Sequence, residues 1–94
     1  MTEILVTNIE FLLFSATNFL PDFVHHLDLY SLAFDDQTKM QLAGMINNEG
    51  RVLRKIIYEG ISLESQLKEI DPSYEPQFNA LRIRYNTAVF NSKN

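Results

Sequence analysis

Apolar residues recur every three or four positions along nearly the whole chain, which is the spacing of one face of an α-helix. We therefore predict an all-α protein, a compact bundle of four main helices and one short helix. No linker, repeat or low-complexity run divides the sequence, so residues 1–94 are expected to form a single helical domain. The tail 91–94 is expected to fray.

Proline and capping residues set the expected bounds of the first two helices. The first is expected to begin at about Thr2 and to end near Leu20, because Pro21 disfavours the α conformation in the residue before it. Pro21 suits the first position of a second helix, which we expect to run to about Phe34. Phe34 itself is expected on the core face of that helix.

Asp, Gly and Ser residues mark the expected helices of the second half. Asp35 and Asp36 are expected to cap a third helix that ends at Gly60. The apolar register of this helix favours continuity through residues 47–50, although Asn-Asn-Glu-Gly is also typical of a turn. The remaining elements are a short helix over about 63–70, capped by Ser62, and a last helix, capped by Ser73.

The predicted helices also carry apolar residues on the side opposite their core faces. A helix that is apolar on two sides is either central in its own fold or covered by a partner. Few helices of a 94-residue protein can be central, so we expect a partner-binding surface; the alternative is that crossing helices bury these residues. The predicted interface residues are Ile4, Phe11, Phe14, Leu29, Leu32, Ile83 and Phe90.

Charge is segregated along the chain. The first 38 residues contain six carboxylates and no Lys or Arg, and all eight cations follow from Lys39 onward. We expect Arg51, Arg54 and Lys55, which cluster on one side of the third helix, to orient a partner by pairing with its carboxylates. The opposite charges of the two halves also favour contact between two copies, so a homodimer is expected.

Glu49 falls within the apolar face of the third helix if that helix is continuous. A carboxylate in such a place has to be paired or neutralised. The candidate partners for a buried ion pair are Arg82 and Arg84 of the last helix, or a residue of a second subunit. The alternative is that a turn at 47–50 exposes Glu49 to solvent.

No motif for catalysis, metal binding or cofactor binding is found. The chain has no Cys, which excludes disulfides, thiolate metal sites and thiol nucleophiles. His25 and His26 are adjacent and point about 100° apart on a helix, so they are interpreted as surface or capping residues. We therefore expect no enzymatic activity, no cofactor and no small-molecule substrate.

These patterns favour a noncatalytic protein-protein interaction module of the adaptor, chaperone or inhibitor type. The alternative is a helix-turn-helix-like DNA-binding regulator, because residues 41–57 loosely match two helices joined by a Gly-containing turn, with Arg51, Arg54 and Lys55 in the second. The net charge of −4 disfavours nucleic acid and anionic lipid as partners.

The apolar stretch 4–20 raises the question of a membrane. It is interrupted by Glu10 and is shorter than the ~20 residues needed to span a bilayer. No cation precedes it, so it lacks the positive region of a signal peptide. We therefore expect a cytoplasmic protein without membrane association.

Overall fold

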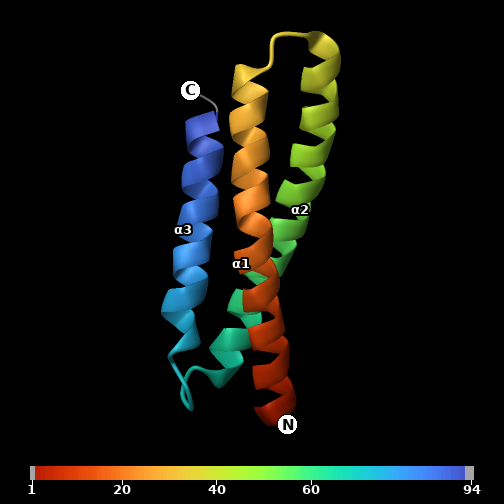
Figure 1. Cartoon of the computed structure of the whole chain (residues 1–94). Helices are drawn as coiled ribbons and strands as arrows, with labels where there is room; N and C mark the ends of the chain where they lie inside the picture. Colours follow the sequence, from red (N-terminus) through yellow and green to blue (C-terminus); the bar gives the residue numbers. More distant parts are fainter. Residues whose placement is uncertain (1, 93–94) are drawn as a thin grey trace.

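The computed structural model describes residues 2–92, which form three helices (Figure 1). α1 spans Thr2–Leu32, α2 spans Asp36–Leu67 and α3 spans Tyr74–Ser92. α1 and α3 run in the same direction, and α2 runs antiparallel to both. The all-α class is confirmed, whereas the division into four main helices and a short one is wrong. Of the tail expected to fray, residues 91–92 are helical and residues 93–94 lie outside the described range.

Pro21 lies inside α1 rather than at a helix boundary. A proline in a helix interior removes one backbone hydrogen bond and costs about 3 kcal/mol. Leu20 and Phe23, on either side of it, are both buried in the core, whereas Pro21 is exposed to solvent. Burial on both sides outweighs the cost of the proline, so the expected boundary at Leu20 is wrong.

α2 is one continuous helix through residues 47–50, as its apolar register predicts. It also continues through Gly60, so the expected stop there and the separate short helix after it are wrong. Gly60 has no left-handed backbone conformation. A Cβ at this position would overlap the ring of Phe78 on α3, so the glycine serves close helix packing rather than helix termination.

The link between α1 and α2 is short, and Asp35 ends it. Its carboxylate accepts hydrogen bonds from the backbone N–H of Thr38 at 3.0 Å and from the Thr38 hydroxyl at 2.9 Å. These bonds lower the pKa of Asp35, and its predicted role as an N-cap is confirmed. Phe34 lies in the same link and is 99% exposed, because α1 ends at Leu32; its expected core position is wrong.

The connection between α2 and α3 is held by Asp71. Its carboxylate accepts from the backbone N–H of Ser73 at 3.1 Å and from the Ser73 hydroxyl at 2.6 Å. These bonds lower the pKa of Asp71, with the hydroxyl making the largest contribution. Ser73 was expected to cap α3 as an acceptor, but its side chain donates to Asp71 instead.

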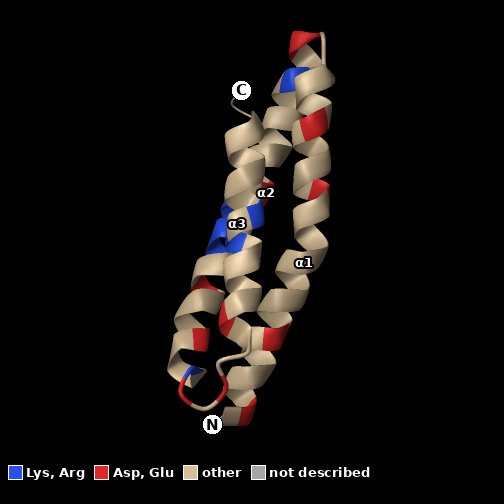
Figure 2. Cartoon of the chain, turned by 90° about the vertical axis from the view of Figure 1, so that its left-hand side faces the viewer, with Lys and Arg blue, Asp and Glu red and all other residues tan. Residues whose placement is uncertain are grey.

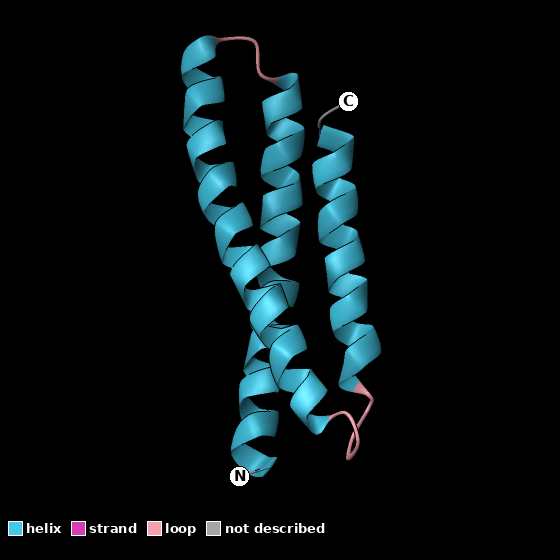
Figure 3. Cartoon of the chain, turned by 180° about the vertical axis from the view of Figure 1, so that it is seen from behind, coloured by secondary structure: helices cyan, strands magenta, loops and turns pink. Residues whose placement is uncertain are grey.

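The core lies where the three helices meet, and it is long and narrow. α2 crosses α1 near the middle of the molecule in the view of Figure 3. Within the core, the rings of Phe23 and Tyr85 stack with centroids 5.4 Å apart. Gly50 of α2 faces both rings, and a Cβ on it would lie 3.3 Å from Phe23. The bundle measures 51 × 21 × 15 Å. The buried apolar residues are Ile9, Ala16, Leu20, Phe23, Leu42, Leu53, Ile57, Leu67, Phe78, Leu81 and Tyr85.

Candidate protein-binding surface

The residues predicted for the interface all lie at the molecular surface. Their exposed fractions range from 40% for Leu29 to 70% for Leu32. Five of them lie on α1, on the side away from its buried residues: Ile4, Phe11, Phe14, Leu29 and Leu32. The three helices therefore leave these side chains exposed to solvent.

Further exposed apolar residues were not predicted. Phe34 and Ile70 are each more than 70% exposed, although Phe34 was assigned to the core and Ile70 to no surface. Among residues 2–92, fourteen large apolar side chains are exposed, against eleven apolar residues that are buried. A folded domain normally exposes some single apolar residues, but here the exposed large apolar side chains outnumber the buried apolar residues.

The outer side of α1 has an apolar segment at each end and a polar segment between them. Because α1 is continuous, residues seven apart share one line along it, and Ile4, Phe11 and Leu32 belong to this line. Asn18 and His25 occupy the same line in its middle. Because α1 is unbroken, apolar residues that the sequence analysis had assigned to two separate helices lie on one line along a single helix.

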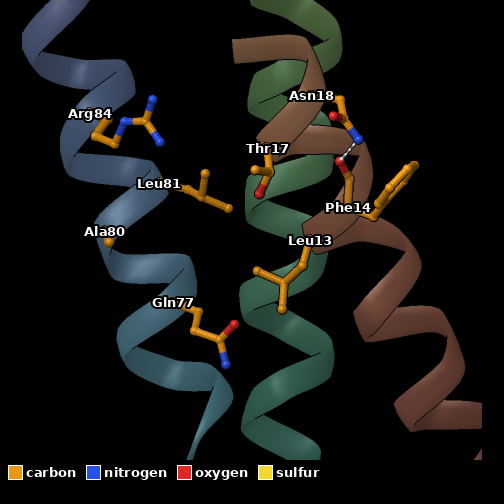
Figure 4. Close-up of a pocket in the computed structure, with 8 residues that line it drawn as sticks. All are labelled: Leu13, Phe14, Thr17, Asn18, Gln77, Ala80, Leu81 and Arg84. Carbon is orange, nitrogen blue, oxygen red and sulfur yellow. Dashed lines mark hydrogen bonds between the residues drawn. The ribbon is translucent and has the colours of Figure 1, made fainter. Parts of the chain in front are cut away.

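An open groove of about 510 Å³ separates α1 from α3 (Figure 4). The side chains of Leu13 and Leu81 point into it from opposite walls, and the ring of Phe14 points away from α3. The guanidinium of Arg84 projects over the groove from α3. The lining residues are Leu13, Phe14, Thr17, Asn18, Gln77, Ala80, Leu81 and Arg84.

Two contacts fix how α1 and α3 are aligned. The hydroxyl of Tyr74 donates a hydrogen bond to Oε1 of Glu10 at 2.8 Å, and the Phe23 ring stacks on Tyr85. The hydrogen bond to Glu10, together with smaller effects of burial and of nearby negative charge, raises the pKa of Tyr74. Each residue of α1 therefore lies at about the same height along the bundle axis as the α3 residue whose number is 62 to 64 higher.

Lys and Arg residues cluster midway along α2 and α3, whereas α1 contains Asp and Glu but no Lys or Arg (Figure 2). Arg54 donates to the hydroxyl of Tyr85 at 2.7 Å, and Arg51 donates to Asn48 at 2.9 Å. Within residues 2–92, Lys and Arg form one ion pair with a carboxylate, between Lys68 and Glu75 at 3.2 Å. The mid-bundle cations thus have no carboxylate partner in the described part of the chain. They are Arg51, Arg54, Lys55, Arg82 and Arg84.

Residues 41–57 do not form a helix-turn-helix. They belong to the single helix α2, so Arg51, Arg54 and Lys55 lie in the middle of a long helix rather than on a separate recognition helix. The structural premise of the DNA-binding alternative is therefore wrong for this segment. The apolar register of α2 runs through the Asn-Asn-Glu-Gly sequence and keeps it helical.

Glu49 has a partner, but it is neither of the two predicted arginines. Its carboxylate is bound by Nδ1 of His26 on α1, and both side chains are largely buried. Arg82 and Arg84 are exposed. The predicted ion pair to α3 is wrong because the face of α2 that carries Glu49 packs against α1 at this level. The sequence analysis had interpreted His26 as a surface or capping residue, and its burial against Glu49 corrects that interpretation.

Glu64 is a buried carboxylate that the sequence analysis did not single out. It is 6% exposed, and its Oε2 atom has no hydrogen-bond partner. Glu64 lies three residues before the buried Leu67, so its position on the core face could have been read from the helical period. Within the described residues, no group of three or more His, Asp or Glu side chains could hold a metal ion.

α1 is long and apolar enough to cross a membrane by length and composition. The sequence had suggested a segment too short to do so, because a boundary was expected at Leu20. α1 also contributes four buried residues to the core of the bundle. Comparison of the chain with protein-family models, with curated proteins and with solved structures finds no match.

Proposed function

We propose that this chain is a noncatalytic protein-protein interaction module, of the adaptor, chaperone or inhibitor type, that acts in the cytoplasm. Its partner-binding surface is the outer side of α1 around Phe11 and Phe14. The observation that carries this proposal is the excess of exposed over buried apolar side chains among residues 2–92. Contiguous exposed apolar surface is typical of sites that bind other proteins.

The shape of the molecule supports the same proposal. A folded monomer of 10.9 kDa is expected to expose about 5,600 Å², whereas this chain exposes 6537 Å². Its radius of gyration is 15.4 Å, against roughly 12 Å for a compact domain of this length. Binding of a partner along the rod would cover part of this additional surface.

The charges support orientation of the partner. The mid-bundle cations have no carboxylate partners among residues 2–92, so they are available to carboxylates of another molecule. Exposed charges of this kind contribute more to the rate and orientation of binding than to affinity. In this proposal Arg51, Arg54 and Lys55 position the partner, and the apolar surface supplies the binding energy.

The test compares two double variants in native extract. Phe11→Asp with Phe14→Asp should leave the circular dichroism spectrum helical and should abolish recovery of the bound partner, measured by copurification and mass spectrometry. Met40→Asp with Tyr58→Asp, at exposed apolar residues of α2, is the matched control and should leave recovery unchanged. Equal recovery with both variants would overturn the proposal, as would unfolding of the first variant, which would show that its rings belong to the core.

A second candidate function is binding of duplex DNA by the mid-bundle cations, and their lack of carboxylate partners is the observation that favours it. Contacts with phosphates give an affinity that falls steeply with salt concentration. A mobility-shift titration at about 50 mM salt tests this function. No binding under that condition would eliminate it.

Association with a bilayer through α1 is tested in parallel by flotation of the protein with vesicles of neutral and of anionic lipid. The proposed function expects the protein to remain at the bottom of the gradient in both cases. Flotation of the wild-type protein, and its loss in the Phe11→Asp, Phe14→Asp variant, would assign the outer side of α1 to lipid instead of protein.

A further inference from the structure

Two hollows follow each other between α1 and α3. The lower hollow is the groove of about 510 Å³ that contains Leu13. The upper hollow, of about 190 Å³, is lined by side chains from residues 24–31 of α1 and 88–92 of α3. α2 lies behind the lower hollow (Figure 4), so its open side faces away from α2. From Leu13 to Ser31 the two hollows extend over about 27 Å, the length of a helix of about 18 residues.

The walls of both hollows favour a helix as the occupant. They are helices whose backbone N–H and C=O groups bind one another, so an extended segment would find no backbone partners there. A helix satisfies its own backbone groups. It also presents side chains at the spacing of the α3 wall, where Gln77, Leu81, Arg84 and Ala88 follow one another. The segment that fits is therefore a fourth helix, on the side of α1 and α3 opposite α2.

Each hollow is lined by one charged residue, and the two charges are opposite in sign. Arg84 lines the lower hollow and is exposed, with no carboxylate partner among residues 2–92. Asp28 lines the upper hollow and is also exposed, and within the same residues its carboxylate has no hydrogen bond or ion pair. Charge complementarity therefore requires a carboxylate of the occupant at the lower hollow and a cation at the upper hollow.

The distance between these two charges matches two turns of a helix. Arg84 lies at the height of residues 20–22 of α1, because residues of α1 and α3 at one height differ in number by 62 to 64. Asp28 is thus six to eight residues, or about 10 Å, further along the bundle. Residues seven apart on a helix are separated by this distance and lie nearly on one line. The occupant therefore carries its carboxylate and its cation seven residues apart on one face.

The direction of the fourth helix sets the order of its two charges. α1 and α3 run in the same direction (Figure 1), so a helix seated on both is favoured by their dipoles when it is antiparallel to them. Such a helix begins at the height of Ser31 and ends near that of Leu13. Its Lys or Arg therefore precedes its Asp or Glu by seven residues.

No helix among residues 2–92 carries this pattern. In the sequence, Lys or Arg is followed seven residues later by Asp or Glu once, at Lys68 and Glu75. Lys68 follows the last residue of α2, whereas Glu75 belongs to α3, and the two side chains pair with each other. A second copy of the chain thus offers no matching helix, and the occupant belongs to a different protein.

We infer that the two hollows bind an amphipathic helix of another protein, which lies antiparallel to α1 and α3 and completes a four-helix bundle. Its apolar face covers Leu13, Phe14 and Leu81, its carboxylate pairs with Arg84, and its cation pairs with Asp28. The inference rests on the proposed function, because it names the class of partner that binds beside Phe14.

Synthetic leucine-faced helices of about 18 residues test the charges, with affinity for the full chain measured by fluorescence anisotropy. The first peptide carries Lys seven residues before Glu and should bind. A second peptide of the same composition carries Glu seven residues before Lys. It matches the two charges only in the parallel direction, against the helix dipoles, and should bind at least twofold more weakly.

Variants of the protein test where the first peptide binds. Arg84→Glu should weaken its binding at least threefold, and replacing the Glu of the peptide by Lys should restore it. Arg82→Glu, at an exposed residue of α3 outside both linings, is the matched control and should leave the affinity unchanged. Ala80→Trp fills the lower hollow and should abolish binding. Asn86→Trp, exposed and outside both hollows, should bind as the wild type does.

Four results would overturn the inference. They are no binding of the first peptide at millimolar concentration, equal affinities for the two charge orders, unchanged binding by Arg84→Glu, and unchanged binding by Ala80→Trp. A doubled molar mass of the wild type that Ala80→Trp returns to 10.9 kDa would also overturn it, by assigning the groove to a second copy.

The copurification experiment separates this inference from the proposed function, because Phe11→Asp with Phe14→Asp reports on any protein partner. A chain that binds neither peptide but still recovers a partner through Phe11 and Phe14 would reject the fourth helix and retain the proposed function.

Discussion

Nδ1 of His26 lies 2.7 Å from Oε1 and 2.9 Å from Oε2 of Glu49, and this contact joins α1 to α2 in the middle of the bundle. The side chains are 19% and 14% exposed, respectively. Because carboxylate oxygens only accept, Nδ1 carries the proton. The imidazole thus donates a hydrogen bond to a carboxylate that the packing of α1 on α2 largely removes from water.

Removal of the imidazole should destabilise the fold. His26→Ala leaves Glu49 largely buried without its partner, and we expect the free energy of unfolding to fall by about 1–3 kcal/mol. His25→Ala, at the exposed neighbouring residue, should change it by no more than about 0.5 kcal/mol. Urea unfolding followed by circular dichroism measures both. Similar losses in the two variants would show that the contact between His26 and Glu49 adds no stability.

Replacement of each of two glycines of α2 by alanine should change the stability of the protein in opposite directions. Gly60→Ala would place a Cβ against the ring of Phe78, and we expect a loss of about 1–3 kcal/mol because α3 must move away. Gly44→Ala meets no atom within 4 Å and should stabilise the helix by about 0.5–1 kcal/mol. Thermal unfolding should therefore shift in opposite directions. A destabilising effect of Gly44→Ala would contradict the open surroundings of that residue.

Asp35 should make stability depend on pH in the acidic range. Its pKa in the folded state is lowered from 3.8 by its hydrogen bonds to Thr38, so the capping carboxylate stabilises the fold fully at pH values above 3.8. That contribution is lost as the pH falls through the lowered pKa. Asp35→Ala should lower the melting temperature at pH 7, whereas Asp35→Asn should keep the cap and remove this pH dependence. An unchanged acid profile of the Asn variant would assign the dependence to other carboxylates.

Replacement of Glu64 should stabilise the protein. Its Oε2 atom is buried without a hydrogen bond, and such a group costs about 1–3 kcal/mol. Glu64→Leu removes this cost and adds apolar contact, so the urea midpoint should rise. Glu59→Leu, at an exposed position of the same helix, is the control for the added apolar side chain. A lower midpoint for Glu64→Leu would indicate that its other carboxylate oxygen makes an essential contact with water.

Local sequence signals predicted those features that depend on neighbouring residues. Asp35 caps α2 because its side chain reaches the backbone three residues on, and the apolar period of α2 continues through residues 47–50. The helical period also identified Phe11, Phe14 and Ile83 as residues outside the core, and all three are exposed. These features need no information about the partner helix.

Features that depend on contacts between helices were not predicted. Pro21 has the local properties of a helix start, yet burial of its neighbours keeps α1 continuous. Gly60 has the local properties of a helix stop, yet it accommodates Phe78. Glu49 had the expected need for a partner, but that partner is His26, which had been interpreted as a surface or capping residue. In each case tertiary packing outweighed local preference.

The unequal lengths of the helices bear on how the molecule opens. α1 and α2 have 31 and 32 residues, whereas α3 has 19 and contributes three buried side chains. Detachment of α3 therefore disrupts less of the core than separation of the two long helices. Amide hydrogens of α3 should exchange with solvent before those in the middle of α1 and α2, and each detachment would uncover Phe23 and Gly60, which Tyr85 and Phe78 otherwise shield.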